Sequence, residues 1–339
     1  MEIGRRSGAV GIAARIPYRS IELVLGVAIM SVLKVEALTK RFADVLAVDD
    51  LSFSVEPGEI YGFLGGNGAG KTTTLRMVLD IIRPTSGRIE VLGGAPDRRN
   101  TAAIGFLPEE RGLYGNMSAI DAITYFGRMK QMAAGDARAH GMELLQRFDL
   151  GDRAKAKISE MSKGMAQKVQ LATAIVNRPR LLILDEPFSG LDPVNQQLLE
   201  DEIVNAAKGG AAVVFSTHVM QHAERLCDRI LLLRKGKKRF EGTIDEARDQ
   251  LPARIDAVAP AGITGIEGIS AAAPTADLGN GWSEYSLSLE PGVDAGDVLQ
   301  RCTASGLPLR RFEERRATLH DVFVHLVGSA PDSSGEIAR

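Results

Sequence analysis

The sequence contains few cysteines and no excess of charge of either sign. Its two cysteines, Cys227 and Cys302, cannot build a disulfide scaffold and do not lie in a metal-ligand spacing, so they fit a reducing cytoplasm. The formal net charge of −2 gives no global sign of nucleic-acid binding. A hydrophobic content of 45% supplies enough apolar material for a core, and 339 residues suit about two domains.

A long hydrophobic run is also absent. Residues 23–30 are apolar and follow several arginines, a pattern that superficially resembles a signal peptide. The run is short, Glu22 precedes it, and no A-x-A-like cleavage site follows before Lys34; a transmembrane helix needs a far longer stretch. We therefore expect residues 1–30 to be a disordered or adventitious extension. Met30 is an alternative start, and a membrane-surface helix is the alternative structure.

The sequence does contain a glycine-rich loop in a context that binds phosphate. The loop consists of Gly65, Gly66, Asn67, Gly68, Ala69, Gly70, Lys71, Thr72 and Thr73. It matches G-x-x-x-x-G-K-[ST], with a predicted strand before it at 60–64 and a predicted helix after it at 72–82. Glycines let backbone N–H groups turn toward an anion, and the helix N-terminus adds partial positive charge.

Lys71 and Thr72 have the chemistry that a nucleotide needs at this loop. The lysine can reach the β- and γ-phosphates, and the threonine hydroxyl can ligate Mg²⁺. The alternative is a glycine-rich turn followed by a chance Lys-Thr pair. Because the predicted strand and helix flank the loop, we favour a nucleoside triphosphate site.

Two carboxylates follow another predicted buried strand. Residues 181–184 are all apolar and directly precede Asp185 and Glu186. The carboxyl ends of parallel strands are where open α/β sheets bind ligands. Asp185 fits the role of a Mg²⁺ partner, and Glu186 fits that of the base that polarises an attacking water. Acids at strand ends also occur by chance, but the phosphate loop favours a catalytic interpretation.

A histidine ends a further predicted strand, residues 211–215. His218 is expected at the same edge of the sheet as Glu186, where it can touch a γ-phosphate, although a lone histidine is usually structural. His222 follows four residues later, a spacing that can ligate zinc on a helix. No third ligand is near, so a metal pair is the weaker alternative.

Aromatic residues are scarce, at 5%, and Phe42 has an informative position. It follows a predicted strand at 32–38 and lies upstream of the phosphate loop. A lone aromatic is usually part of the core; the alternative is that Phe42 stacks on a nucleotide base, with Val48 packed on the same ring. From Ser118 to Ile175 the hydrophobic period becomes helical, which indicates a mostly helical insert.

The sequence changes character after residue 247. Residues 252–281 are richer in Ala, Gly and Pro, and the predicted elements beyond them are strands at 285–289 and 307–312 and helices at 294–303 and 318–327. We predict a small accessory α+β domain over 252–328 and a disordered tail over 329–339. Nothing in this part carries visible catalytic chemistry.

The order of these motifs resembles that of an ATP-binding cassette (ABC) ATPase over roughly residues 31–247. The resemblance implies an α/β P-loop NTPase fold: a RecA-like core, antiparallel β strands and a helical subdomain at about 110–175. It implies that ATP and Mg²⁺ bind. The family positions that match are Phe42 for the A-loop, Glu109 for the Q-loop ligand of Mg²⁺, Ser162 and Gly164 for the signature, Asp192 for the D-loop and His218 for the switch.

Three departures from the family pattern qualify the resemblance. The signature LSGGQ is replaced by Met161-Ser162-Lys163-Gly164-Met165, with Ser162 a good helix N-cap. Glu109 replaces the Q-loop glutamine and adds a negative charge near the triphosphate. Gly66 replaces a proline and should loosen the loop slightly. The PEERGLY and SKGM forms resemble a subgroup that serves ABC-2-type exporters, including sodium-extrusion and drug-efflux ATPases.

The resemblance implies the energising subunit of an exporter. Two copies would close head to tail around two ATP molecules and drive a separate permease, which the family docks at about residues 109–130. The chain would then be cytoplasmic and peripheral on the inner face of the membrane. A soluble cassette acting on ribosomes or DNA is the alternative, although such relatives carry two cassettes or a long coiled coil. A non-hydrolysing regulatory protein is a third, less favoured because Lys71, Asp185, Glu186 and His218 are intact.

Overall fold

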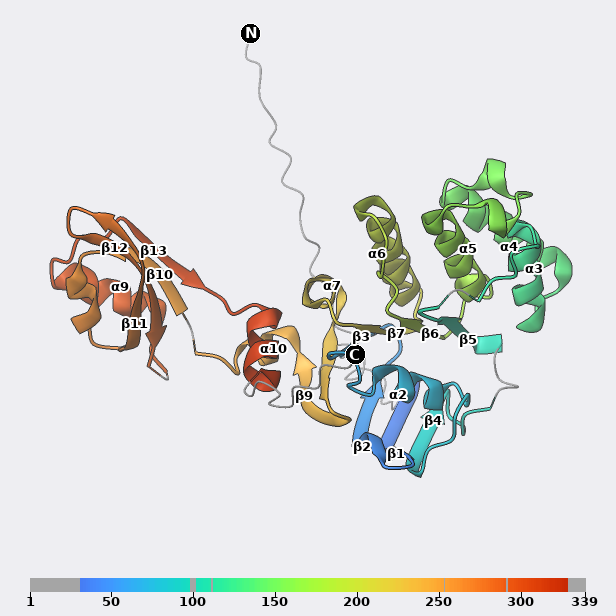
Figure 1. Ribbon diagram of the computed structural model, residues 1–339, viewed down its shortest axis with the longest axis horizontal. Coiled ribbons are helices and arrows are strands. Elements are labelled where there is room, and N and C mark those ends of the chain that lie inside the picture. Colours follow the sequence, from blue (N-terminus) through green and yellow to red (C-terminus); the bar gives the residue numbers. More distant parts are fainter. Residues whose placement is uncertain (1–30, 98–101, 111, 253, 291, 329–339) are drawn as a thin grey trace, which may run out of the picture.

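The computed structural model describes residues 31–97, 102–110, 112–252, 254–290 and 292–328. The expectations for residues 1–30 and 329–339 lie outside these ranges, as does Arg111 of the PEERGLY motif. The described chain forms three sheets (Figure 1). Two are built from strands within residues 33–243 and the third from strands within residues 254–315.

The central sheet has the strand order β5-β6-β7-β3-β8-β9. Its strands are β5 (Ile104–Leu107), β6 (Leu181–Asp185), β7 (Ala212–Thr217), β3 (Ile60–Leu64), β8 (Arg229–Arg234) and β9 (Lys237–Thr243). All neighbours pair in parallel except β8 and β9, and β3, β6 and β7 are buried throughout. Leu64 pairs with Thr217, and Asp185 with Ser216. The three strands therefore end together at one edge of the sheet.

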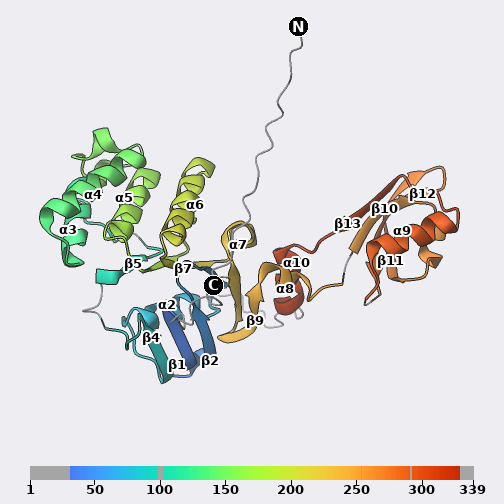
Figure 2. The same cartoon turned by 180° about the vertical axis from the view of Figure 1, so that it is seen from behind.

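An antiparallel sheet covers one face of the central sheet. It consists of β1 (Leu33–Phe42), β2 (Val45–Val55) and β4 (Ser86–Val91), and it lies on the same side as α2 (Lys71–Val78) in Figures 1 and 2. One buried cluster joins Val35, Leu51 and Phe53 of this sheet to Phe63 and Val214 of the central sheet. The strand β2 is continuous over these residues, although its register with β1 is irregular.

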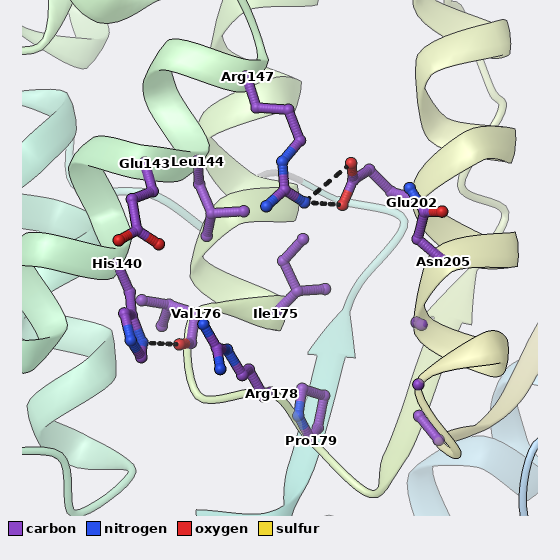
Figure 3. Close-up of a pocket in the computed structure, with 13 residues that line it drawn as sticks. His140, Glu143, Leu144, Arg147, Ile175, Val176, Arg178, Pro179, Glu202 and Asn205 are labelled. Atoms are coloured by element: carbon purple, nitrogen blue, oxygen red, sulfur yellow. Dashed lines mark hydrogen bonds and ion pairs between the residues drawn. The ribbon is translucent and has the colours of Figure 1, made fainter.

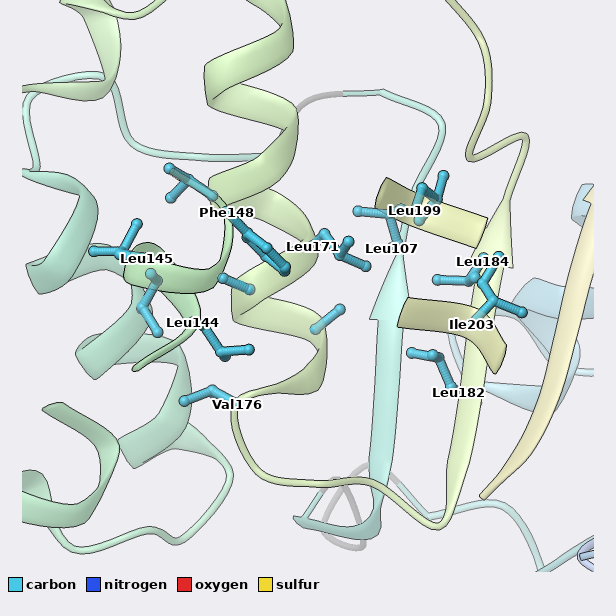
Figure 4. Close-up of a cluster of buried hydrophobic side chains, with 14 of the residues drawn as sticks. Leu107, Leu144, Leu145, Phe148, Leu171, Val176, Leu182, Leu184, Leu199 and Ile203 are labelled. Atoms are coloured by element: carbon cyan, nitrogen blue, oxygen red, sulfur yellow. The ribbon is translucent and has the colours of Figure 1, made fainter. Parts of the chain in front are cut away.

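The helical insert covers the opposite face. It contains α3 (Ala119–Met129), α4 (Ala134–Arg147), α5 (Lys163–Ile175) and two short 3₁₀ turns, Gly151–Arg153 and Ile158–Glu160; α6 (Pro193–Lys208) packs beside it. Figure 4 shows Phe148 and Leu171 reaching toward Leu182 and Leu184 of β6, with Leu199 of α6 closing the cluster. The predicted α/β core with a helical subdomain is confirmed.

Gly105 on β5 allows the signature helix α5 to approach the sheet closely. A Cβ atom at this position would collide with the Ala174 carbonyl oxygen and lie 2.9 Å from both Leu182 Cδ1 and Pro179 Cγ. We expect Gly105→Ala to lower the free energy of unfolding by about 2 kcal/mol, as overpacking does. Chemical unfolding followed by circular dichroism measures the loss.

Gly135→Ala is the matched control for this prediction. Gly135 lies on α4, and a Cβ atom there meets nothing within 4 Å. Alanine is also the better helix former, so this variant should be neutral or slightly stabilised. Equal stability of the two variants would contradict the close approach.

The C-terminal part forms its own antiparallel sheet with the order β11-β12-β10-β13. It contains β10 (Arg254–Ala259), a 3₁₀ helix (Ala261–Gly265), β11 (Ile269–Gly279), β12 (Trp282–Leu289), α9 (Ala295–Ala304) and β13 (Arg311–Arg315). Ile255, Leu287 and Val298 share a separate buried cluster. Figure 1 shows this unit extending to one side, away from the helical insert.

The last helix differs from the expected domain limits. The sequence placed residues 318–327 in the accessory domain, but α10 (Leu319–Val327) packs against α7 (Met220–Leu226), α8 (Ile244–Arg248) and β9. Leu319 N–H donates to Glu224 Oε1 at 2.6 Å, and Leu319 and Val322 are fully buried. Helical periodicity shows that a segment has an apolar face, but it does not show which surface that face covers.

Candidate nucleotide-binding site

The phosphate loop curls around the ammonium group of Lys71. Gly68 and Gly70 adopt positive φ angles of 73° and 103°, and a Cβ at Gly70 would lie 2.6 Å from the Ala47 carbonyl oxygen. Lys71 is buried, and its Nζ donates to the carbonyl oxygens of Gly65 at 2.7 Å and Gly66 at 3.4 Å. The helix α2 begins at Lys71, so its N-terminal N–H groups face the same loop.

Thr72 and Asp185 bring two oxygen ligands together beside the loop. The Thr72 hydroxyl donates to Asp185 Oδ1 at 3.2 Å, although the two residues are 113 positions apart. The Ser216 hydroxyl donates to the same carboxylate oxygen at 2.6 Å. A hydroxyl and a carboxylate oxygen are the protein ligands that Mg²⁺ accepts beside a triphosphate, so this pair fits the ion.

Glu186 lies between Lys71 and His218. Its Oε1 is 3.2 Å from Lys71 Nζ, and its Oε2 is 3.0 Å from His218 Nδ1. The residue adopts a left-handed φ of 45°, a costly conformation for a non-glycine residue, and its N–H donates to Ser216 Oγ at 2.9 Å. The Glu186 side chain is 10% exposed and that of His218 57%, so the carboxylate is sheltered and the imidazole faces outward.

Phe42 and Val48 come from the antiparallel sheet that lies next to the loop. Phe42 is 46% exposed, with Lys40 Nζ 4.8 Å from its ring centroid, so the ring has a free face rather than a place in the core. Val48 is fully buried, and a Cβ atom on Gly70 would lie 3.4 Å from its Cγ2. Val48 therefore packs against the phosphate loop at Gly70.

The remaining predicted residues form two further groups. Glu109 is exposed and follows β5, while Ser162, Gly164 and Asp192 lie at the N-terminal ends of α5 and α6. Ser162 Oγ accepts from Met165 N–H at 3.3 Å, and a Cβ on Gly164 would lie 2.9 Å from Asn195 Nδ2. Asp192 accepts from Asn195 N–H at 3.0 Å, and this bond lowers the pKa of the Asp192 carboxyl.

Two polar residues near the site were missed by reasoning from the sequence. Ser216 links Asp185 to the Glu186 backbone, and Gln170 of α5 donates to the carbonyl oxygens of Pro108, at 3.5 Å, and Glu110, at 3.3 Å. Gln170 thereby holds the segment that carries Glu109. Ser216 had a signal, since it immediately precedes Thr217-His218 at a strand end; Gln170 had none, because its partner lies 60 residues away.

His218 and His222 do not form the alternative zinc pair. His218 Nδ1 contacts Glu186, whereas His222 Nδ1 lies 3.3 Å from Glu200 Oε1, and the His222 ring stacks on Phe188. Within the described ranges, no group of three or more His, Cys, Asp or Glu side chains is arranged to hold a metal ion. The i, i+4 spacing is therefore used to contact two different partners.

The phosphate loop after β3, the two acids at the end of β6 and the histidine after β7 define a P-loop nucleoside triphosphatase. Comparisons with known proteins narrow this class. Residues 48–189 match the family described as ABC transporter, and residues 242–327 match the C-terminal domain described as ATP-binding protein DrrA1-3-like. The chain belongs to the ABC transporter ATP-binding proteins, which are ATPases coupled to transport. The second match begins before residue 252 and includes α10.

Similar proteins span nearly the whole chain. An ABC transporter ATP-binding protein of Bacillus subtilis, YhaQ, is 35% identical and covers 88% of this chain and 99% of its own. The Nod factor export ATP-binding protein I of Burkholderia orbicola is 36% identical, and the match covers 85% of this chain and 94% of that protein. The daunorubicin resistance ATP-binding protein DrrA3 of Streptomyces coeruleorubidus is 33% identical, and the match covers 87% of this chain and 95% of that protein.

The solved structures agree with the fold. The ATP-binding subunit of an ABC transporter matches with a TM-score of 0.61 at 30% identity, covering 65% of this chain and 93% of its own. The predicted family, fold class and ATPase activity are confirmed, and ATP binding with them. None of the helices in the described ranges has the length and apolar character needed to cross a bilayer.

Proposed function

We propose that this chain energises export: two copies close head to tail around two ATP molecules and drive a separate membrane permease from its cytoplasmic side. The contact of Glu186 with both Lys71 and His218 carries the proposal, because it places a sheltered carboxylate beside the lysine that would bind the γ-phosphate, where a base can act on an attacking water. Two relatives that cover most of the chain are named for export and for drug resistance, which supports the direction.

The residues of the loop divide the work on ATP. Backbone N–H groups of residues 65–70 and the Lys71 ammonium bind the phosphates, and Phe42 offers its exposed ring face to the base. Thr72, Asp185 and, after some movement, Glu109 would hold Mg²⁺, which neutralises charge on the phosphates when bound. Glu186 accepts the proton of the attacking water, and His218 holds the Glu186 carboxylate in place.

The second copy accounts for residues that do not contact this chain's own loop. Ser162 and Asp192 are exposed caps at the starts of α5 and α6, and the N-terminal N–H groups and partial positive charge of α5 suit an anion. The Lys163 side chain lies beside Gly190, two residues before Asp192. The starts of α5 and α6 therefore form one surface. We infer that this surface completes the ATP site of the partner copy.

An apolar groove supports a permease partner. It has a volume of about 530 Å³ and lies between α2 and the helical insert, where Leu79, Ile81, Phe106, Leu113 and Phe126 contribute to its lining. The groove includes part of the predicted docking segment, residues 109–130. A short apolar segment of a membrane protein fits this lining by chemistry and volume.

Co-purification of the tagged chain from native membranes, followed by mass spectrometry, tests the partner. We expect a polytopic membrane protein in equal amount and an ATPase rate that changes in its presence. Ile81→Asp should abolish its recovery without changing intrinsic ATPase activity, because Ile81 lies in the groove and is 46% exposed.

Leu278→Asp is the matched control, since Leu278 is 53% exposed but lies on β11 of the C-terminal sheet. Equal recovery of the membrane protein with both variants would contradict docking at the groove. A soluble dimer free of membrane protein, or association with ribosomal proteins, would contradict the export proposal itself.

A further inference from the structure

A cluster built around three buried side chains lies next to the catalytic residues and is not used by the mechanism above. It consists of Phe188, Glu200, His222 and Arg225, which we call the His222 cluster. The His222 and Phe188 rings stack at a centroid distance of 4.0 Å and an interplanar angle of 10°. His222 Nδ1 lies 3.3 Å from Glu200 Oε1, and Arg225 binds the same carboxylate. His222 and Glu200 are both 6% exposed.

The His222 cluster joins three segments of the chain. In each segment, a residue predicted for the ATP site precedes the residue that belongs to the cluster. Phe188 follows Glu186 by two positions, and His222 follows His218 by four. Glu200 lies on α6, the helix that Asp192 caps. Only Val219 separates His218 from the first residue of α7. A shift of α7 therefore displaces His218 directly.

The chemistry of the cluster makes this connection firm. A buried carboxylate needs polar partners, and here both come from α7: Arg225 donates to Glu200, while His222 Nδ1 lies 3.3 Å from both Glu200 Oε1 and Arg225 Nη2. Burial lowers the pKa of the His222 imidazole, which favours the neutral ring that stacks on Phe188. The ring thus uses its edge to hold α6 and its face to hold the segment after Glu186.

A second ion pair on α6 provides a natural comparison. Glu202 is also buried and receives two hydrogen bonds from Arg147 of α4, at 3.2 and 3.0 Å (Figure 3). Residues i and i+2 point to different sides of a helix. The Glu202 pair consequently ties α6 to the helical insert rather than to α7.

We propose that His222 is a positioning residue for ATP hydrolysis: by holding α7 against Phe188 and α6, it keeps His218 at hydrogen-bond distance from Glu186. The proposal rests on the proposed roles of Glu186 and His218. It assigns His222 to the hydrolytic step rather than to nucleotide affinity, because the hydrogen-bond and ring contacts of His222 go to Glu200, Arg225 and Phe188 rather than to the phosphate loop.

Steady-state ATPase kinetics of His222→Ala and Phe188→Leu test the proposal. We expect kcat to fall by about tenfold or more, with KM for ATP changed by less than about twofold, as for an interaction made in the transition state. His222→Gln keeps a polar amide that can hydrogen-bond to Glu200 or Arg225, so it should recover part of the kcat that His222→Ala loses. Phe188→Leu keeps an apolar side chain, so it provides a reading if His222→Ala fails to fold.

Arg147→Ala is the matched control, because it strips the cation from an equally buried carboxylate on the same helix. It should lower the melting temperature yet leave kcat within about twofold, since nothing at α7 changes. If kcat falls equally in Arg147→Ala and His222→Ala, the effect is general destabilisation and the proposal is overturned.

His218→Ala and Glu186→Gln, measured alongside, separate this proposal from the one on which it rests. If either of them retains full hydrolysis, the proposed roles of the two residues fail. If both lose hydrolysis while His222→Ala and Phe188→Leu keep the wild-type kcat, the positioning role alone is overturned.

Discussion

Glu186→Gln is expected to reduce ATP hydrolysis by about 10²-fold or more while ATP still binds. The amide has the shape of the carboxylate and can still meet His218, but it cannot accept a proton from water. It also no longer pairs with Lys71 Nζ, which is 3.2 Å away, so the ammonium is freer to bind phosphate. The variant should therefore accumulate as an ATP-bound dimer. Phosphate release and size-exclusion chromatography with ATP measure the two effects.

Glu59→Gln is the control for this substitution. Glu59 is a buried carboxylate paired with Arg229 at 3.1 Å, outside the ATP site. Its burial raises the pKa of the Glu59 carboxyl, so a neutral amide is tolerated there at modest cost. This variant should hydrolyse ATP at close to the normal rate. Hydrolysis by Glu186→Gln within tenfold of wild type would show that another group is the base.

The centre of the site was predictable because its contacts follow from local motifs and from one rule about sheets. Lys71 and Thr72 belong to a contiguous motif, and Asp185 and His218 each follow an apolar run. Since parallel strands end at one edge, three distant segments had to meet there. The 3.2 Å contact between Thr72 and Asp185 shows this convergence.

Contacts made by side chains between helices could not be read in the same way. Gln170, Glu200 and Glu202 look like ordinary polar positions of helices, and their burial depends on which helix packs beside them. The i, i+4 spacing of His218 and His222 is visible in the sequence, but it is compatible both with a shared metal ion and with two separate partners. Only the positions of Phe188 and Glu200 decide between them.

The C-terminal part was least predictable for a related reason. The strand β11 is mostly exposed and made largely of small residues, so it lacks the alternation that marks a half-buried strand. Its pairing with β12, rather than its own pattern, makes it a strand. The limits of the accessory domain, 252–328, stay a prediction, because α10 packs on the nucleotide-binding half rather than on the C-terminal sheet.

Lys71→Ala is expected to weaken ATP binding by at least about tenfold, the loss of one charge-assisted hydrogen bond to phosphate. The Lys71 ammonium is held by the Gly65 and Gly66 carbonyl oxygens and by Glu186. The substitution therefore removes both the phosphate donor and the ammonium group that pairs with Glu186. Titration with a fluorescent ATP analogue measures the affinity.

Arg76→Ala is the matched control, because it removes a positive charge from the same helix α2 at an exposed position in the last turn. Affinity for the analogue should stay within about twofold, since an exposed charge is screened by solvent. Ionic strength distinguishes the two variants further. Raising it should reduce any effect of Arg76→Ala on affinity, whereas the effect of Lys71→Ala should persist because the Lys71 contact is buried. Equal loss of affinity in both variants would mean that general charge on α2, rather than the Lys71 contact, holds the triphosphate.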